Sequence, residues 1–216
     1  QRSSELKLLA AFLLPYHGLG TEIGKKQKKS NLVFMMLAEG IKYPHRDAND
    51  VDTMVQGCFR LREMMSSFKA LKESGAELDL MGGTSPIVTP TTASEVDALR
   101  LSIGLLLENI KELWLPTLDL VLVAEAVLSS SANHMHPPLS ERDLQDFVAW
   151  LEQVGLAEIW KLPRLLDGKQ LMARFKVTGA QVGLLVEAQR KWQILNPNGS
   201  VEECEAHLLS FLADIK

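Results

Sequence analysis

Few residues of this 216-residue chain have the types and spacings that enzyme chemistry needs. His134 and His136 could share a metal ion, but they lie in a Ser/Pro-rich segment without a nearby carboxylate or cysteine, which favours a solvated loop. Asp50-Val-Asp52 and Glu141-Arg-Asp143 each bring two acids together, yet both strings are typical of helix starts, where the helix dipole stabilises acids. No nucleophile, base and orienting group can be assembled, so we assign no catalytic residue and no metal site.

The two thiols and the remaining histidines also favour structural roles. Cys58 falls on the apolar stripe of a predicted helix and is expected to be an inert core thiol. Cys204 has three acidic neighbours, which would raise its pKa rather than activate it. His17 and His207 have no sequence partner that would make either a catalytic base. No glycine-rich phosphate loop of either usual spacing occurs, so nucleotide binding of that kind has no support.

Basic residues are unevenly distributed along a chain whose net charge is −4. Two windows, 24–46 and 161–192, each carry a net charge of +5, so the rest of the chain carries −14. Such asymmetry presents basic surface to an anionic partner, although lysine-rich solvated helix faces are the alternative. The basic residues of the two windows are Lys25, Lys26, Lys28, Lys29, Lys42 and Arg46, then Lys161, Arg164, Lys169, Arg174, Lys176, Arg190 and Lys191.

The elements that must position these residues are predicted to be helices. Between Val51 and Leu71, apolar residues recur every three or four positions, which predicts an amphipathic helix of about five turns. A second helix is expected from Ser94, capped through Asp97, to about Trp114. The run 118–123 alternates like a strand, but its continuation as AEAVL favours a helix, which Pro116 separates from the one before.

The chain is therefore predicted to be all-α, with a multi-helix body at 1–128 and a smaller helical tail at 139–216. Gly, Pro and Ser mark two linkers, a flexible one at about 74–92 within the body and one at 129–138 between body and tail. Ser140 is expected to cap the first tail helix toward Asp143, and Ser200 with Glu203 forms a capping box for the last.

Aromatic residues and composition complete the structural expectations. Trp114, Trp150 and Trp160 are expected in the core, and Trp192 either stacks on a base or, as we favour, packs under the Asn196–Gly199 turn. No apolar run is long enough to cross a bilayer, and two cysteines cannot build a disulfide framework. We expect an intracellular protein with no membrane partner, whose cytoplasmic, nuclear and mitochondrial forms the sequence does not distinguish. Because it begins at Gln1, we expect a fragment or processed form.

The segment 162–208 resembles the tail of eukaryotic class II CCA-adding enzymes, the tRNA nucleotidyltransferases. That tail has a Gly-Lys pair before a short helix, a glycine turn, a helix, and a Trp-Gln pair followed by a Pro-x-Gly turn. The matching positions are Gly168-Lys169, Gly179, Gly183, Trp192-Gln193 and Asn196-Pro-Asn-Gly199. The family's Gly-Pro turn is Gly179-Ala180 here.

The resemblance continues upstream, in the same order as in the family's body. The stretch 7–19 is similar to its leucine-rich helix ending at a Pro-aromatic pair, and 24–51 to its basic loop and following helix with a Lys-x-Pro turn. The stretch from Arg100 to Gly104, with the later Trp114, resembles the body's Arg-x-x-x-Gly helix. A Leu-Arg pair of that helix is Leu107-Glu108 here.

The resemblance implies a tRNA-binding role without chemistry of its own. In the family, a head carries an Asp-x-Asp pair for Mg²⁺ and a neck carries a Glu-Asp-x-x-Arg motif that pairs with CTP or ATP. Asp50-Val-Asp52 has the first spacing but lacks the strand and Gly-Ser context of the family's metal pair, and the closest string to the second motif, Glu141-Arg-Asp143, has the wrong order and spacing. The body and tail hold the acceptor stem and T arm. The resemblance therefore implies tRNA and the head and neck region as partners, with no cofactor in this chain. The RNA-binding candidates are Lys25, Lys26, Lys28, Lys29, Lys42, Arg46, Lys169, Arg174 and Lys176.

Two other function classes remain open. A non-catalytic helical protein-interaction module would use the basic windows against an acidic partner or not at all. A self-sufficient hydrolase or transferase is disfavoured because no catalytic set can be assembled.

Overall fold

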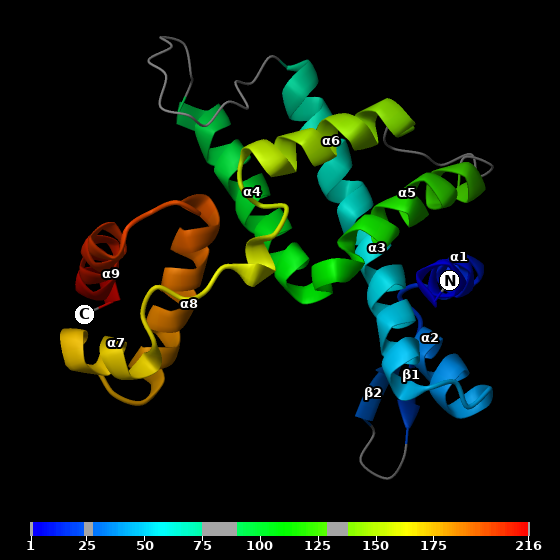
Figure 1. Ribbon diagram of the computed structural model, residues 1–216, viewed down its shortest axis with the longest axis horizontal. Helices are drawn as coiled ribbons and strands as arrows, with labels where there is room; N and C mark the ends of the chain where they lie inside the picture. Colours follow the sequence, from blue (N-terminus) through cyan, green and yellow to red (C-terminus); the bar gives the residue numbers. More distant parts are fainter. Residues whose placement is uncertain (1, 24–27, 75–89, 129–137, 216) are drawn as a thin grey trace. The chain divides into compact units, whose positions relative to one another are not determined.

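The structure is a computed structural model that describes residues 2–23, 28–74, 90–128 and 138–215 (Figure 1). Their regular secondary structure is helical apart from one short hairpin, which confirms the predicted all-α class. The chain divides into two compact units, and neither is continuous in sequence. Unit 1 comprises residues 1–80 and 109–150, and unit 2 comprises residues 81–108 and 151–216.

Unit 1 is organised around the long helix α3 (His45–Glu73), with α1 (Arg2–Leu13) and α5 (Trp114–Leu128) packed against it and against each other (Figure 1). The predicted apolar stripe of α3 is buried, except that Leu71 is only half-buried. The helix begins at His45, six residues before the predicted start at Val51. The apolar pattern missed its first turns because they are largely polar and carry no apolar period. The run 118–123 lies within α5, which confirms the helix prediction there.

Helix α6 (Glu141–Gln153) contributes its first part to unit 1. Phe147 and Trp150 pack against Phe68 of α3, with ring centroids 5.4 and 4.9 Å from the Phe68 ring. Lys69 and Lys72 of α3 also make ion pairs with acids of α6, at 3.0 and 2.6 Å. Residues 139–150 therefore pack with the body, whereas the sequence analysis placed them in the tail. The expected linkers fall almost entirely outside the described residues.

Unit 2 contains α4 (Pro90–Ile110) up to Glu108, then α7 (Gly168–Phe175), α8 (Ala180–Leu195) and α9 (Val201–Ile215). Helix α8 packs against both α7 and α9 (Figure 1). Their shared core consists of buried side chains from all three helices and from the segments on either side of α7. It contains Leu166, Leu171, Val177, Leu185, Ala188, Cys204 and Leu208.

Arg100 and Gly104, the residues of the Arg-x-x-x-Gly pattern, both lie on the face of α4 that contacts α8. The Arg100 guanidinium donates to the Leu195 carbonyl at 3.0 Å, and Gly104 lies against the Ile194 side chain. The spacing of four residues places both groups on one helix face. This pattern therefore has a packing role in unit 2.

Helix starts follow the predicted capping residues in two of three cases. Ser140 Oγ accepts from the Asp143 N–H at 3.2 Å, and Ser200 Oγ accepts from the Glu203 N–H at 3.2 Å, which confirms both caps. The predicted cap at Ser94 is wrong, because α4 begins at Pro90 and Ser94 lies inside the helix. Proline is well suited to a first helical position, since its missing N–H has no helical partner there.

The end of α4 also differs from the prediction. It stops at Ile110 rather than near Trp114, and a 3-10 turn at Lys111–Leu113 leads directly into α5. Pro116 lies in the first turn of α5, so it begins the next helix rather than ending the previous one. Within the described residues, no helix combines the length and apolar character needed to cross a membrane.

Candidate nucleic-acid interface

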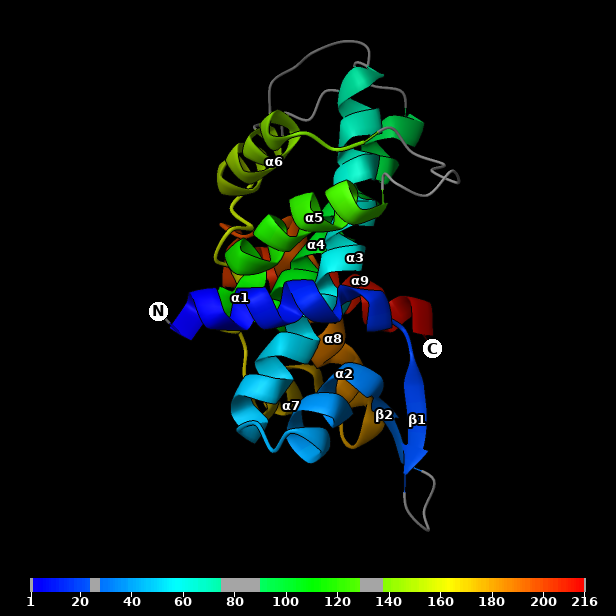
Figure 2. The ribbon, with the colours of Figure 1, turned by 90° about the vertical axis from the view of Figure 1, so that its right-hand side faces the viewer.

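A short hairpin in unit 1 carries the first lysine run. Strands β1 (Gly20–Ile23) and β2 (Lys28–Asn31) pair antiparallel, and Figure 2 shows them running side by side away from the end of α1. Lys28 and Lys29 stand on β2, with Lys29 in register opposite Glu22. Lys25 and Lys26 lie outside the described residues. Lysine on a two-stranded ribbon discourages pairing with further strands, so this placement has a structural explanation beside the RNA-binding one.

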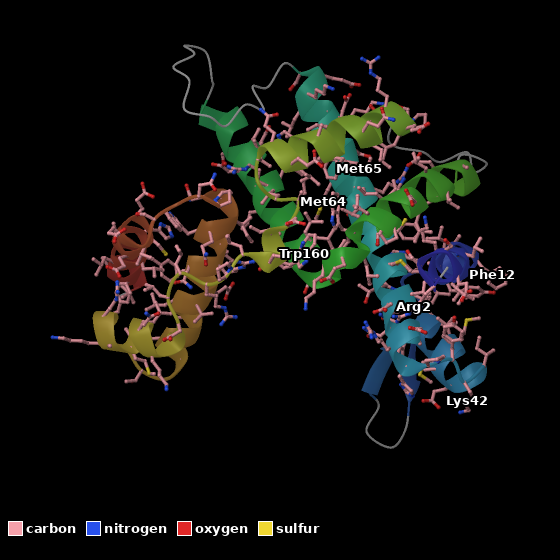
Figure 3. All side chains as sticks on the ribbon, viewed as in Figure 1. Arg2, Phe12, Lys42, Met64, Met65 and Trp160 are labelled. Atoms are coloured by element: carbon pink, nitrogen blue, oxygen red, sulfur yellow. The ribbon has the colours of Figure 1, made fainter. Side chains whose placement is uncertain are left out.

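Lys42 and Arg46 flank the start of α3. Lys42 follows a π-helix at Met36–Gly40 and lies 3.4 Å from Glu39, but both side chains are exposed, so the pair contributes little. Arg46 is exposed and has no ion-pair partner among the described residues. Figure 3 shows Lys42 at the turn that precedes α3, on the same unit as Arg2. Unit 1 thus presents two cations at the N-terminus of α3.

In unit 2, more than half of the basic window is neutralised by acids of the same unit. Lys161 pairs with Glu158 at 2.6 Å, and Lys191 pairs with Glu187 at 2.7 Å. The other two pairs join separate helices, namely Arg174 with Glu205 and Arg190 with Glu108. The Arg174 charge, which the sequence analysis counted among the RNA-binding candidates, is therefore shared with a carboxylate of α9.

Arg164, Lys169 and Lys176 are the cations of this window without an acidic partner among the described residues, and all three are exposed. Asp167 fixes the start of α7 by accepting from the Gln170 N–H at 2.8 Å, and this places Lys169 in the first turn. Lys176 ends the same helix. Seven residues of helix separate them by about 10 Å. Arg164 was not among the predicted RNA-binding residues, although it lies within the basic window.

Three non-glycine residues of the described chain adopt a left-handed backbone, and all three are lysines. Their φ angles are 56° at Lys42, 50° at Lys111 and 54° at Lys176. Such a backbone costs an ordinary L-residue roughly 1–2 kcal/mol, and asparagine or glycine usually occupies it. A lysine at a helix end gains some interaction with the helix dipole, but this gain is generally below the cost. Retained strain of this kind is commonly associated with function.

Lys111 is a residue that the sequence analysis did not select. It lies outside both basic windows, next to Glu112, so local charge gives no signal there. Its distinguishing feature is the backbone conformation at the break between α4 and α5. Sequence alone indicates a break near Pro116 but not which residue adopts the left-handed conformation.

The acidic pairs have structural partners. Asp50 lies 3.5 Å from Arg2, whereas Asp52 accepts from Asn31 at 2.7 Å. The two carboxylates are engaged in different directions, and they lie in the second turn of α3 rather than at its start. Within the described ranges, no three His, Cys, Asp or Glu side chains gather as metal ligands.

The second acidic string gives a helix cap, as expected. Burial raises the pKa of Asp143, but hydrogen bonds from Ser140 and Lys69 outweigh that effect and hold it below its ordinary value. Asp143 is thus a structural anion.

Both thiols are buried. Burial raises the pKa of Cys58 to about 12 and also raises that of Cys204. Cys58 therefore matches its predicted role. The direction for Cys204 was also expected, but its cause is burial in the α7–α9 core rather than the acidic neighbours.

His17 packs against another ring, and three of the four tryptophans pack as expected. His17 stacks on Phe59 with centroids 3.8 Å apart, and burial lowers its pKa, so the neutral ring is favoured. Trp192 lies against Gly199, where any Cβ would overlap its ring, which confirms packing under the turn. Trp114 and Trp150 are buried as predicted, whereas Trp160 is only half-buried beside Lys161.

Two glutamines of α8 are hydrogen-bonded to the loop before α7. The Gln189 side chain accepts from the Leu166 N–H at 3.1 Å and donates to its carbonyl at 3.0 Å. Gln193, of the Trp-Gln pair, donates to the Pro163 carbonyl at 3.0 Å. These contacts hold the loop that carries Arg164 against α8.

Comparison with known proteins gives one partial match. The chain is similar to the tRNA nucleotidyltransferase cca2 of Schizosaccharomyces pombe, with 29% identity over 110 residues, and the alignment covers 50% of this chain and 22% of that relative. The chain thus spans about a fifth of the length of the relative it matches. No family model and no solved structure matches the chain.

Proposed function

We propose that this chain is the tRNA-binding portion of a class II CCA-adding enzyme. It would hold the acceptor stem and T arm while a head and neck region, not contained in this sequence, adds C, C and A with Mg²⁺, CTP and ATP. The partial similarity to a tRNA nucleotidyltransferase supports the proposal. We also expect the protein to act inside the cell, in the cytoplasm, the nucleus or the mitochondrion.

The observation that carries the proposal is a set of exposed cations without acidic partners in each unit. In unit 1 this set contains Arg46, and in unit 2 it contains Arg164, Lys169 and Lys176. Lys42 lies near Arg46 in the sequence and makes only an exposed pair with Glu39. Proteins recognise helical RNA mainly through phosphate and 2′-hydroxyl contacts, which need such cations rather than a base-reading motif. Two separate sets suit two parts of one folded RNA.

The experiment is a titration of labelled tRNA with the full chain at several salt concentrations. In unit 1, Arg46→Gln should weaken tRNA binding, and neutralising the lysine run predicted from the sequence, Lys25, Lys26, Lys28 and Lys29, together to glutamine should lower tRNA affinity about tenfold or more and flatten the salt slope. Neutralising Arg164, Lys169 and Lys176 should have a similar effect. A single-stranded RNA of equal length should bind less tightly than tRNA.

A matched control removes four charges that are engaged in ion pairs elsewhere. Lys7, Lys72, Lys161 and Lys191 pair with Asp119, Asp146, Glu158 and Glu187, respectively. Their joint replacement by glutamine changes the net charge by the same amount as the variant of the lysine run. We expect less than about threefold loss of affinity, since only nonspecific attraction changes. Equal effects of the control and the test variants would argue against defined RNA contacts.

The second candidate, a helical protein-interaction module, is favoured by the outward face of α1. Leu8 and Phe12 are 72% and 73% exposed, opposite the buried face formed by Leu6, Ala10 and Leu13. Figure 3 shows Phe12 projecting away from α3 and α5. A helix that is apolar on two faces is unusual for a free surface. If neither set of cations affects tRNA binding, this candidate replaces the first.

Catalysis would require the other region of the enzyme. The Glu-Asp-x-x-Arg motif does not occur in the sequence, and the one Asp-x-Asp string, Asp50-Val-Asp52, lies within α3 with its two carboxylates engaged by Arg2 and Asn31. Two-metal transfer needs carboxylates that clamp the metal ions. We therefore expect no nucleotide incorporation into tRNA lacking CCA when this chain is supplied alone with CTP, ATP and Mg²⁺. Incorporation above a protein-free control would contradict the proposal.

A further inference from the structure

Unit 1 contains a cavity of about 660 Å³ at the N-terminal end of α3. Its walls come from the starts of α1 and α3 and from the turn between α4 and α5. Its floor is packed core, because Leu6, Met54 and Ile110 line it and are almost fully buried. The volume lies in the range of about 300–1,000 Å³ that is typical of ligand sites.

Three cations line the cavity, and two of them make no ion pair with the described residues. Arg2 is held by Asp47 and lies 3.5 Å from Asp50, so its charge is already balanced. Arg46 and Lys111 line the same cavity and have no acidic partner among the described residues. Glu112 is the remaining acid of the lining. The three cations and two acids of the lining give it a net charge of +1.

The backbone places Lys111 at this cavity under strain. Its φ of 50° is one that asparagine or glycine adopts more readily, and it occurs where the turn Lys111–Leu113 joins two helices. A smaller residue would satisfy the turn with less strain, so the turn does not explain why a lysine is present. An ionic role for its side chain would explain it.

Neutral donors complete the lining. Asn49 and Thr53 lie on the α3 wall, and Ser3 lies on the α1 wall. Side-chain amides and hydroxyls of this kind are common contacts to phosphate and ribose oxygens in protein–nucleic acid complexes. Together with the apolar floor, they give the cavity a polar rim above a rigid base.

We propose that this cavity binds one phosphodiester group of an RNA backbone, with Arg46 and Lys111 as its cations. The inference rests on the proposed function and adds Lys111 to it as a contact residue. A single phosphodiester carries one negative charge and matches the net charge of the lining, whereas a nucleoside triphosphate would bring several charges against Asp50 and Glu112.

The test compares tRNA binding by the full chain and by single variants. Lys111→Asn removes the charge but keeps a residue that tolerates the left-handed backbone, and Arg46→Gln removes the other cation. Each should weaken tRNA binding about three- to tenfold near 0.1 M salt and lower the log–log salt slope by about 1. Lys111→Arg should keep the affinity. Glu112→Gln should raise it about twofold, because a repulsive charge is removed.

The matched control is Lys72→Asn, which removes one charge from the other end of α3. Arg46 and Lys72 are separated by about 39 Å of helix, so this change should leave affinity and salt slope unaltered. Thermal unfolding of each variant checks that the fold is kept. ATP, at the same phosphate concentration as the RNA, should not displace tRNA from the chain.

The outcomes separate this inference from the proposed function. If the unmodified chain does not bind tRNA, the proposed function fails, and this inference fails with it. If the unmodified chain binds tRNA but Lys111→Asn and Arg46→Gln bind as it does, only this inference is overturned. Displacement by ATP would overturn the assignment to a phosphodiester.

Discussion

Gly104 of α4 lies directly against the Ile194 side chain of α8. An added Cβ would overlap Ile194 Cγ2 and lie 3.2 Å from its Cγ1, and Ile194 is completely buried. The glycine therefore allows the close approach of the two helices, while Arg100 one turn earlier donates to the carbonyl at the end of α8. This contact between α4 and α8 accounts for both Arg100 and Gly104, the two residues of the Arg-x-x-x-Gly pattern.

Gly104→Ala should destabilise the chain. Alanine favours the helix by about 1 kcal/mol, but overpacking against the buried Ile194 costs about 2–3 kcal/mol, so we expect a net loss of about 1–2 kcal/mol in the free energy of unfolding. Gly183→Ala is the matched control, since an added Cβ on that exposed glycine of α8 meets nothing within 4 Å. It should stabilise the chain by about 0.5–1 kcal/mol. Urea unfolding measures both, and the same sign for the two variants would contradict this explanation.

Arg190 should contribute substantially to the stability of unit 2. It pairs with Glu108 and donates to the Ile159 carbonyl at 2.8 Å, and only 15% of its side chain is exposed. Arg190→Ala leaves a partly buried carboxylate and a carbonyl without this donor, so we expect a loss of about 2–3 kcal/mol. Lys191→Ala removes an exposed pair with Glu187 and should cost less than about 1 kcal/mol. Similar losses in urea unfolding would argue against a special role for Arg190.

The Glu108–Arg190 pair also explains one departure from the family pattern. The family pattern has an arginine where this chain has Glu108, and Glu108 forms an ion pair with Arg190. An arginine at position 108 would instead place two cations next to each other. From the sequence alone, Glu108 is only a departure from the family pattern. Its partner lies 82 positions away in the chain, and no local pattern indicates such a contact.

Elements with one well-packed face were predictable from the sequence, and polar ones were not. The stripe of α3 repeats every three to four residues because one side of that helix faces α1 and α5. The β1–β2 hairpin was missed because GTEI and KKSN lack the apolar alternation of a half-buried strand.

The sequence predicted the positive charge of the candidate site but not its geometry. The basic windows showed which residues are cations, but they did not show which of these cations are neutralised by acidic residues. Arg174 illustrates the limit, because Glu205 reaches it from another helix. Lys111 illustrates the converse, since its location at the cavity depends on a helix break and a backbone angle.

Cys58 should make stability depend on pH in the alkaline range. Its pKa is about 12 in the folded chain because of burial, and close to its ordinary value when unfolded. A raised pKa contributes stability that is complete below the unfolded value and is lost as pH rises toward the folded value. We therefore expect the thiol to lower the free energy of unfolding by at most about 1.4 kcal/mol per pH unit above about pH 9.

Urea unfolding between pH 8 and pH 11 tests this dependence against Cys58→Ala, which lacks the titrating group. The variant should be less stable at neutral pH because of the cavity it leaves, but its stability should fall less steeply with pH. Parallel pH profiles would contradict the assignment. Thiol reagents should modify Cys58 and Cys204 only after unfolding, because both are buried.

Lys176 allows strain and function to be separated within one helix. It ends α7 with a φ of 54°, whereas Lys169 lies in the first turn of the same helix with an ordinary backbone. Lys176→Gly relieves the left-handed strain but loses the dipole interaction and increases unfolded-state entropy, so stability should stay equal or rise by up to about 1 kcal/mol. Lys169→Gly has no strain to relieve and should lose about 1 kcal/mol.

The two glycine variants remove the same charge, so they should weaken tRNA binding by similar factors, about three- to tenfold each. Lys176→Gly would then combine unchanged or improved stability with weaker binding, which is the signature of a residue retained for function at the expense of stability. Urea unfolding and tRNA titration of the same preparations give both quantities. Normal tRNA affinity in Lys176→Gly would show that the lysine serves the helix end alone, and a loss of stability equal to that of Lys169→Gly would show that its backbone is not strained.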